Sequence, residues 1–130
     1  MWEYRGKRLE LDLEDYDTAV RYQQALEAMA ARERQMKETL ASDGDSALRG
    51  PEGIRAYVEM FRSFFAALFG QQAMEELFEG RYNIRECDEA YLSLLEYIRG
   101  QLQAARQRKE RFAAYLPQSR QRSADGKESM

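Results

Sequence analysis

Cys87 is the only cysteine of this 130-residue sequence, which contains no histidine. Without histidine the chain cannot form a Ser-His-Asp or Cys-His arrangement for nucleophilic catalysis, and one cysteine cannot build a zinc site. Residues 50–53, Gly-Pro-Glu-Gly, have neither the spacing nor the lysine of a phosphate-binding loop. The sequence therefore predicts a protein that is not an enzyme and has no catalytic, cofactor-binding or metal-binding residues.

Acidic side chains between Asp12 and Asp17 are the remaining candidates for cation ligands. This run lacks the glycine and the spaced ligands of a calcium loop. Negative charge suits the positive end of a helix dipole, and Asp15 or Asp17 can act as a helix N-cap. We therefore interpret the run as the lead-in to a helix.

Charge is distributed unevenly along the chain. Residues 1–98 hold 12 Lys and Arg against 20 Asp and Glu, a net charge of −8, whereas residues 99–130 hold 8 against 3, a net charge of +5. This asymmetry fits self-association, an anionic partner, or simply a solvated basic tail. The cations able to attract phosphates include Arg106, Arg108, Lys109, Arg111, Arg120 and Arg122. No nucleic-acid-binding motif accompanies them, so we do not predict nucleic acid as the main partner.

The composition is that of one soluble helical domain, with 44% hydrophobic and 33% charged residues. The sequence has no apolar run of eighteen residues and no signal-peptide pattern at its start, so no membrane association is expected. A single cysteine excludes an intrachain disulfide. Together these features predict a cytoplasmic protein.

The most apolar stretch, which must position the rest, runs from Ile54 to Tyr91. Its first part repeats apolar side chains at three- and four-residue spacings, which places them on one face of a helix. Gly70 ends this helix, and a shorter apolar patch follows before Gly80. A further helix then carries Cys87 on its apolar line, which predicts a buried structural thiol.

We predict an all-α fold, a bundle of three or four helices with a small N-terminal β-hairpin and a long C-terminal helix. The single domain covers residues 1–116, with a polar hinge at 42–46 and a disordered basic tail at 117–130. The expected elements are a hairpin at 2–13 and helices at about 17–41, 51–69, 71–79 and 84–115. Asn83 followed by Glu86 has capping-box spacing, which predicts the start of the last helix. Beyond Gly100 that helix has little to bury, so it either frays or packs on another molecule.

The many aromatic and other large apolar residues of the two central helices suggest a site for a partner. If the two central helices carry more apolar surface than a 130-residue bundle can bury, the remainder would form a groove for an amphipathic helix. The alternative is that all of them belong to the core, and the sequence leaves both open. The candidate partner-binding residues are Phe61, Phe64, Phe65, Leu68, Phe69, Met74, Leu77 and Phe78.

The order of several residues resembles small proteins encoded in the tail modules of phages and prophages of Gram-positive bacteria. The residues that carry this resemblance are Phe64-Phe65, Leu68-Phe69-Gly70, Leu77-Phe78, Asn83, Cys87 and Glu89-Ala90-Tyr91. The likeness covers residues 4–98 and includes the N-terminal strand and the acidic lead-in. The basic extension after Gly100 departs from it, so the chain is either a minimal member or one that makes an added contact.

The resemblance is to tail assembly chaperones. It implies a non-catalytic protein of the bacterial host cytoplasm that binds the tape measure protein and helps recruit tail tube subunits, and some such chaperones also have a longer frameshifted product. Two alternatives stay open. One is a generic helical oligomerisation or adaptor module, and the other is a small phage regulator that binds nucleic acid through its basic C-terminal segment.

Overall fold

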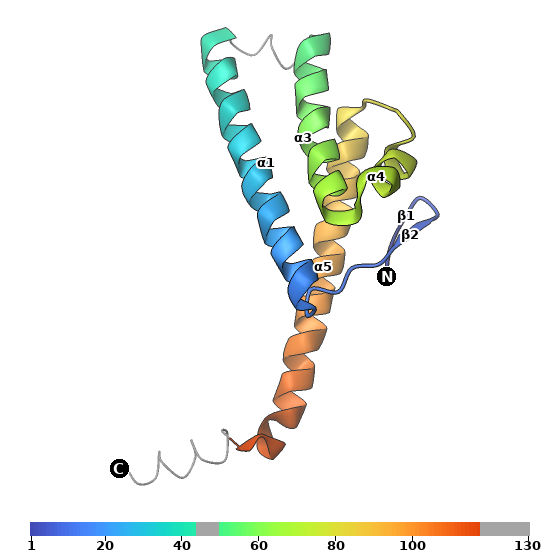
Figure 1. The fold of residues 1–130 in the computed structure, drawn as a ribbon, viewed down its shortest axis with the longest axis vertical. Coiled ribbons are helices and arrows are strands. Elements are labelled where there is room, and N and C mark those ends of the chain that lie inside the picture. Colours follow the sequence, from blue (N-terminus) through green and yellow to red (C-terminus); the bar gives the residue numbers. More distant parts are fainter. Residues whose placement is uncertain (44–49, 118–130) are drawn as a thin grey trace, which may run out of the picture.

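The computed structural model describes residues 1–43 and 50–117. These residues form two strands, four α-helices and a 3-10 turn (Figure 1). The elements in chain order are β1 (Trp2–Tyr4), β2 (Lys7–Leu9), α1 (Tyr16–Asp43), α3 (Pro51–Phe69), α4 (Gln71–Phe78), α5 (Ile84–Phe112) and η1 (Ala113–Tyr115). The predicted fold class, an all-α bundle with a small N-terminal hairpin and a long last helix, is confirmed.

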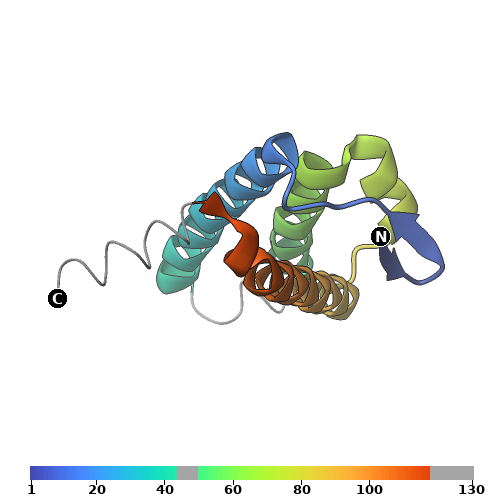
Figure 2. The same ribbon diagram turned by 90° about the horizontal axis from the view of Figure 1, so that it is seen from below.

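Helix α3 is the central element, since it contacts α1, α4 and α5. In Figure 1, α1 and α3 run side by side and α5 crosses them and continues well below the other helices. Figure 2, seen from below, shows the hairpin on the side of α4 and away from α1. The apolar stripe of α1 packs toward this core through Tyr22, Leu26, Met29 and Met36.

The helix ends follow the local signals of the sequence. Pro51 opens α3, and Gly70 ends it with a φ of 100°, a conformation that favours glycine. At the start of α5, the side-chain oxygen of Asn83 accepts a hydrogen bond from the Glu86 N–H at 3.0 Å. The predicted cap at Asn83 is therefore confirmed.

The hairpin is shorter than the predicted range of 2–13. Its strands pair Trp2 with Leu9 around Arg5-Gly6, both of which have positive φ, as a two-residue primed turn requires. After Leu9 the chain leaves the ladder and packs on α5, because Gln101 donates to the Leu11 carbonyl at 2.8 Å and accepts from the Leu13 N–H at 2.9 Å. One glutamine side chain thus replaces the strand pairing that alternation predicted.

Other boundaries shift by a few residues. Helix α1 begins at Tyr16 and extends to Asp43, so the first two residues of the predicted hinge at 42–46 are helical. Helix α5 gives way to a 3-10 turn after Phe112. The remainder of the hinge and nearly all of the predicted tail at 117–130 lie outside the described residues.

Candidate protein-binding surface

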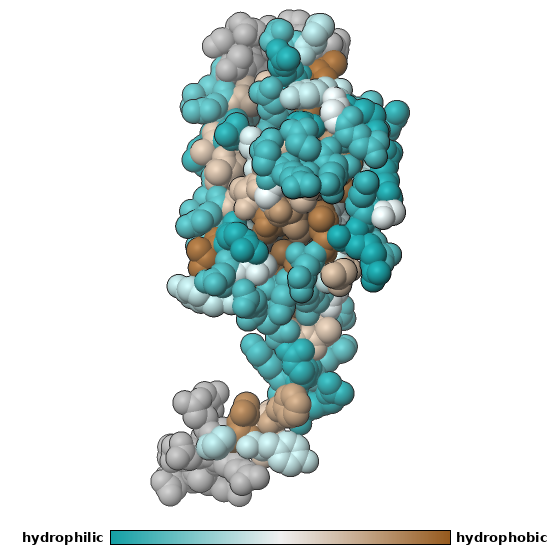
Figure 3. All heavy atoms as spheres, turned by 45° about the vertical axis from the view of Figure 1, so that its right-hand side comes forward, coloured by the Kyte–Doolittle hydropathy of each residue, from teal (hydrophilic) through white to brown (hydrophobic). Residues whose placement is uncertain are grey.

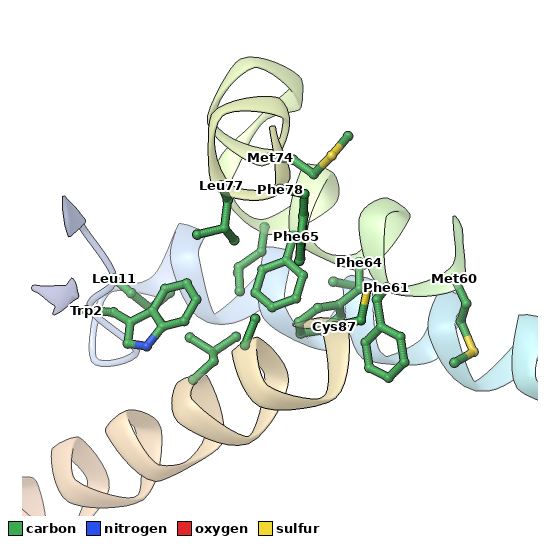
Figure 4. Close-up of a cluster of buried hydrophobic side chains, with 14 of the residues drawn as sticks. Trp2, Leu11, Met60, Phe61, Phe64, Phe65, Met74, Leu77, Phe78 and Cys87 are labelled. Atoms are coloured by element: carbon green, nitrogen blue, oxygen red, sulfur yellow. The ribbon is translucent and has the colours of Figure 1, made fainter. Parts of the chain in front are cut away.

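The eight side chains predicted to contact a partner lie mostly inside the molecule. Seven of them are no more than 6% exposed, and Phe69 is half-buried. Figure 4 shows several pointing toward one another from α3 and α4. The seven are Phe61, Phe64, Phe65, Leu68, Met74, Leu77 and Phe78. The structure places them in the core, and binding a partner through them stays a prediction that requires the helices to separate.

Phe65 shows how tightly this core is connected. Its ring is fully buried and meets Phe64 and Phe78 edge to face, with centroids 5.4 and 5.3 Å away. It also stacks on Trp2 of the hairpin at 5.8 Å. Aromatic pairs of this kind contribute about 0.5–1.5 kcal/mol each beyond their burial. The aromatic residues therefore join the hairpin, α3 and α4 into one unit.

Cys87 is completely buried on α5, so the predicted burial of this thiol is confirmed. Burial raises the pKa of the Cys87 thiol to about 12, and the neighbouring Asp88 carboxylate adds to the rise. The side chain is therefore a neutral thiol at physiological pH and a poor nucleophile. Residues 1–43 and 50–117 contain no group of three His, Cys, Asp or Glu side chains that could hold a metal ion. No helix in the described ranges is both long and apolar enough to cross a membrane.

An open groove with a mixed polar and apolar lining lies at the C-terminal end of α3. We call it the α3 groove, and its lining residues are Leu9, Glu10, Arg21, Ala66, Ala67, Leu68, Phe69 and Gly70. Figure 3 shows hydrophobic side chains gathered in the middle of this side of the molecule, among hydrophilic ones. Of the eight predicted residues, the half-buried Phe69 contributes accessible surface to the α3 groove, and the buried Leu68 lies beneath it.

Three local features build the α3 groove. Gly70 ends α3 with a positive φ and has open space where a side chain would be, and the preceding Ala67 is exposed. Trp2 stacks on Phe69 at 5.7 Å, so the hairpin is held against that turn and Leu9 is placed at its edge. Glu10 and Arg21 contribute charges of opposite sign to the lining. The lining therefore combines apolar side chains with two charged ones.

A second pocket surrounds Arg62, a side chain that the sequence did not mark as unusual. Arg62 is 7% exposed, and its Nη2 pairs with the Glu75 carboxylate at 2.9 Å while its guanidinium lies 4.9 Å from the Tyr82 ring centroid. Its Nη1 has no hydrogen-bond partner among the described residues. Because Glu59 and Glu75 both line this pocket, its charge opposes binding of an anion.

The last part of α5 projects from the body of the protein. We call residues 99–116 the arm. In Figure 1 it extends beyond every other helix, and Figure 3 shows hydrophobic side chains near its end. Its large apolar residues are about half exposed or more, namely Leu102 (51%), Phe112 (52%), Leu116 (49%) and Tyr115 (73%). The predicted overhang of the last helix is therefore present.

The acidic run between Asp12 and Asp17 packs beside the base of the arm. We call it the acidic turn. Glu14 pairs with Arg108, and Asp15 accepts hydrogen bonds from the Thr18 N–H and hydroxyl at 3.2 and 3.1 Å. Asp15, rather than Asp17, is therefore the N-cap of α1. The interpretation of this run as a helix lead-in is confirmed.

Comparison with known proteins adds one finding. The profile of a family described as "Family of unknown function (DUF6673)" matches residues 5–126. The chain belongs to the DUF6673 family. No curated protein and no solved structure matches it. The DUF6673 match includes the arm.

The α3 groove of this DUF6673 protein was only partly visible in the sequence. Leu68 and Phe69 were singled out, but Leu9, Ala66 and Ala67 were not. The sequence did contain a signal for the alanines. Ala66 and Ala67 are two small side chains just before Leu68-Phe69 at the end of a helix, and small side chains leave room beside a helix. Nothing local marks Leu9 as a neighbour of α3, because that contact joins residues about sixty positions apart.

Proposed function

We propose that this DUF6673 protein is a non-catalytic tail assembly chaperone that binds the tape measure protein and helps recruit tail tube subunits. The α3 groove is the observation that carries the proposal, and the resemblance over residues 4–98 supplies the identity of the partner. A long helix with an apolar stripe needs a temporary partner that covers the stripe before assembly.

The α3 groove has the features expected of a helix-binding site. Ala67 is exposed and small, so the backbone of a docked helix can approach α3 closely. Phe69 and Leu9 are half-buried and present apolar surface on either side. The charges of Glu10 and Arg21 can pair with polar residues that flank the apolar stripe of the partner. The site therefore suits an amphipathic helix better than a small molecule.

The experiment uses co-expression with the tape measure protein encoded in the same tail module. The wild-type chain should raise the soluble yield of the tape measure protein and co-purify with it. Ala67→Glu should weaken co-purification about tenfold or more, because it places an unpaired charge against an apolar helix. Ala56→Glu is the matched control, since Ala56 is also an exposed alanine of α3 but does not line the α3 groove.

Both variants should keep the helical circular dichroism and the melting temperature of the wild type, because both sites are on the surface. Equal co-purification of Ala67→Glu, Ala56→Glu and wild type would exclude the α3 groove as the binding site. Absence of any effect of the wild-type chain on the tape measure protein would overturn the chaperone proposal itself.

A further inference from the structure

One apolar line continues along the whole of α5. Its members recur at alternating spacings of three and four residues, which is the pattern of a helix that packs along a second helix. Ile98 and Ala105 of this line are buried, with 5% and 7% exposed, whereas Leu102 and Phe112 are 51% and 52% exposed. In order the apolar positions are Tyr91, Leu95, Ile98, Leu102, Ala105 and Phe112, and the basic Lys109 takes the position between the last two. The arm thus extends the core-facing stripe of α5 past the end of the core.

The arm carries positive charge beside this stripe. Arg106, Lys109 and Arg111 are exposed, while Arg108 is paired with Glu14 of the acidic turn. Residues 99–117 hold five cations, counting Arg99, against the single anion Glu110. The surface that covers the arm should therefore be apolar in its centre and acidic at its edge.

The protein itself presents such a surface at the base of the arm. The acidic turn carries Asp12 and Asp17, both exposed, and Tyr16 between them in the chain is 80% exposed. The acidic turn is attached to α5 by the bonds between Leu13 and Gln101 and between Glu14 and Arg108. Exposed carboxylates and the exposed ring of Tyr16 thus belong to a turn that is bonded to the arm at Gln101 and Arg108.

We propose that the arm binds a second copy of this chain, in a two-fold symmetric dimer whose arms cross antiparallel. With a rise of about 1.5 Å per residue, Phe112 lies about 21 Å beyond Ile98 along the helix, so each arm reaches back to the base of the other. There its outer apolar residues meet Leu102 and Tyr16 of the second copy. Its outer cations, Lys109 and Arg111, meet the acidic turn. Symmetry forms every one of these contacts twice.

The charge pattern favours a second copy over nucleic acid as the occupant. A phosphate backbone would have to approach cations that stand beside the acidic turn, and Glu14 already neutralises Arg108. Residues 1–98 are negative overall and residues 99–130 are positive, so the arm of one copy and the body of the other have opposite charge. The inference uses the arm and not the α3 groove, so its failure leaves the proposed function untouched.

Light scattering and sedimentation velocity of the purified full chain over a dilution series test the dimer. The wild type should have a mass near twice the 15.2 kDa of one chain. Leu102→Asp and Phe112→Asp should each raise the dissociation constant about tenfold or more, because symmetry introduces the charge twice. Leu92→Asp is the matched control. Leu92 is 58% exposed on α5 but lies before the arm, so this variant should remain dimeric.

A charge exchange tests the pairing of the arm with the acidic turn. The double variants Lys109→Glu/Arg111→Glu and Asp12→Lys/Asp17→Lys should each dimerise more weakly than wild type, and a mixture of the two should regain a heterodimer. A monomeric wild type, or a dimer unaffected by Phe112→Asp, overturns the proposal. So does a doubled mass that nuclease treatment abolishes, since nucleic acid would then be the ligand of the arm.

Discussion

The indole Nε1 of Trp2 donates a hydrogen bond to the Ser93 hydroxyl oxygen at 3.1 Å, across 91 positions of the chain. The same indole stacks on Phe65 and Phe69 of α3. The second residue of the chain thus joins α3 to α5 and holds the hairpin at the edge of the α3 groove. An isolated two-stranded hairpin is marginal in water, so this anchor explains how it persists.

Two substitutions that weaken or remove this anchor should lower the free energy of unfolding by different amounts. Ser93→Ala should reduce the free energy of unfolding by about 1 kcal/mol, because it deletes one hydrogen bond and leaves the indole N–H unpaired. Trp2→Ala should cost about 3–5 kcal/mol, because it also empties part of the core. Urea unfolding followed by circular dichroism measures both. The control is Ser63→Ala, since Ser63 is a half-buried serine of α3. If Ser63→Ala lowered the free energy of unfolding as much as Ser93→Ala, the result would contradict the role given to Ser93.

Phe65 should be among the most costly positions to truncate. Phe65→Ala should lower the free energy of unfolding by about 3–5 kcal/mol, because the fully buried ring contacts four other aromatic rings. Fluorescence of Trp2, the only tryptophan, should shift to longer wavelength as the indole gains water. Leu92→Ala, at an exposed position of the same protein, should change stability by no more than about 0.5 kcal/mol. A small effect of Phe65→Ala would mean that the ring is not in the core in solution.

Cys87 should resist thiol reagents in the folded protein. Its thiol is completely buried and its pKa is raised to about 12, so the thiolate is scarce at neutral pH. Modification by a disulfide reagent at pH 8 should proceed at the rate of unfolding and accelerate with denaturant. The control is the variant Ala67→Cys/Cys87→Ala, whose single cysteine is at an exposed position. If Cys87 of the wild type were labelled as fast as this cysteine without denaturant, that result would contradict its burial.

Glu86 should make stability depend on pH in the acid range. Hydrogen bonds from Arg81 and from Arg5 lower the pKa of the Glu86 carboxyl below its usual 4.5. A lowered folded-state pKa means that the stabilisation is complete above 4.5 and is lost as the pH falls through the folded value. The melting temperature of Glu86→Gln should therefore start lower than wild type at pH 7 and decrease less on acidification. Glu96→Gln, an exposed position of α5, should follow the wild-type curve; parallel curves for Glu86→Gln and wild type would contradict the prediction.

Much of the helical framework follows from short-range signals. Pro51 and Gly70 bound α3 at the predicted residues, and Asn83 caps α5 as its spacing to Glu86 indicates. Such signals work because capping and backbone preference depend on a few neighbouring residues. The predicted length of the hairpin was wrong because it depends on a residue far away in the chain. Gln101, about ninety positions away, supplies the hydrogen bonds that draw Leu11 and Leu13 out of a strand.

The sequence by itself determined that this chain is helical, where α3 and α5 start, and that one helix extends past the last apolar cluster. Only the tertiary structure decided which apolar faces are covered. Phe64 and Phe65 are in the core because Trp2, Tyr22 and Phe78 close around them, whereas Leu102 and Phe112 carry the same kind of pattern and are left exposed. Periodicity records that a face is apolar, but its burial depends on contacts between residues far apart in the chain.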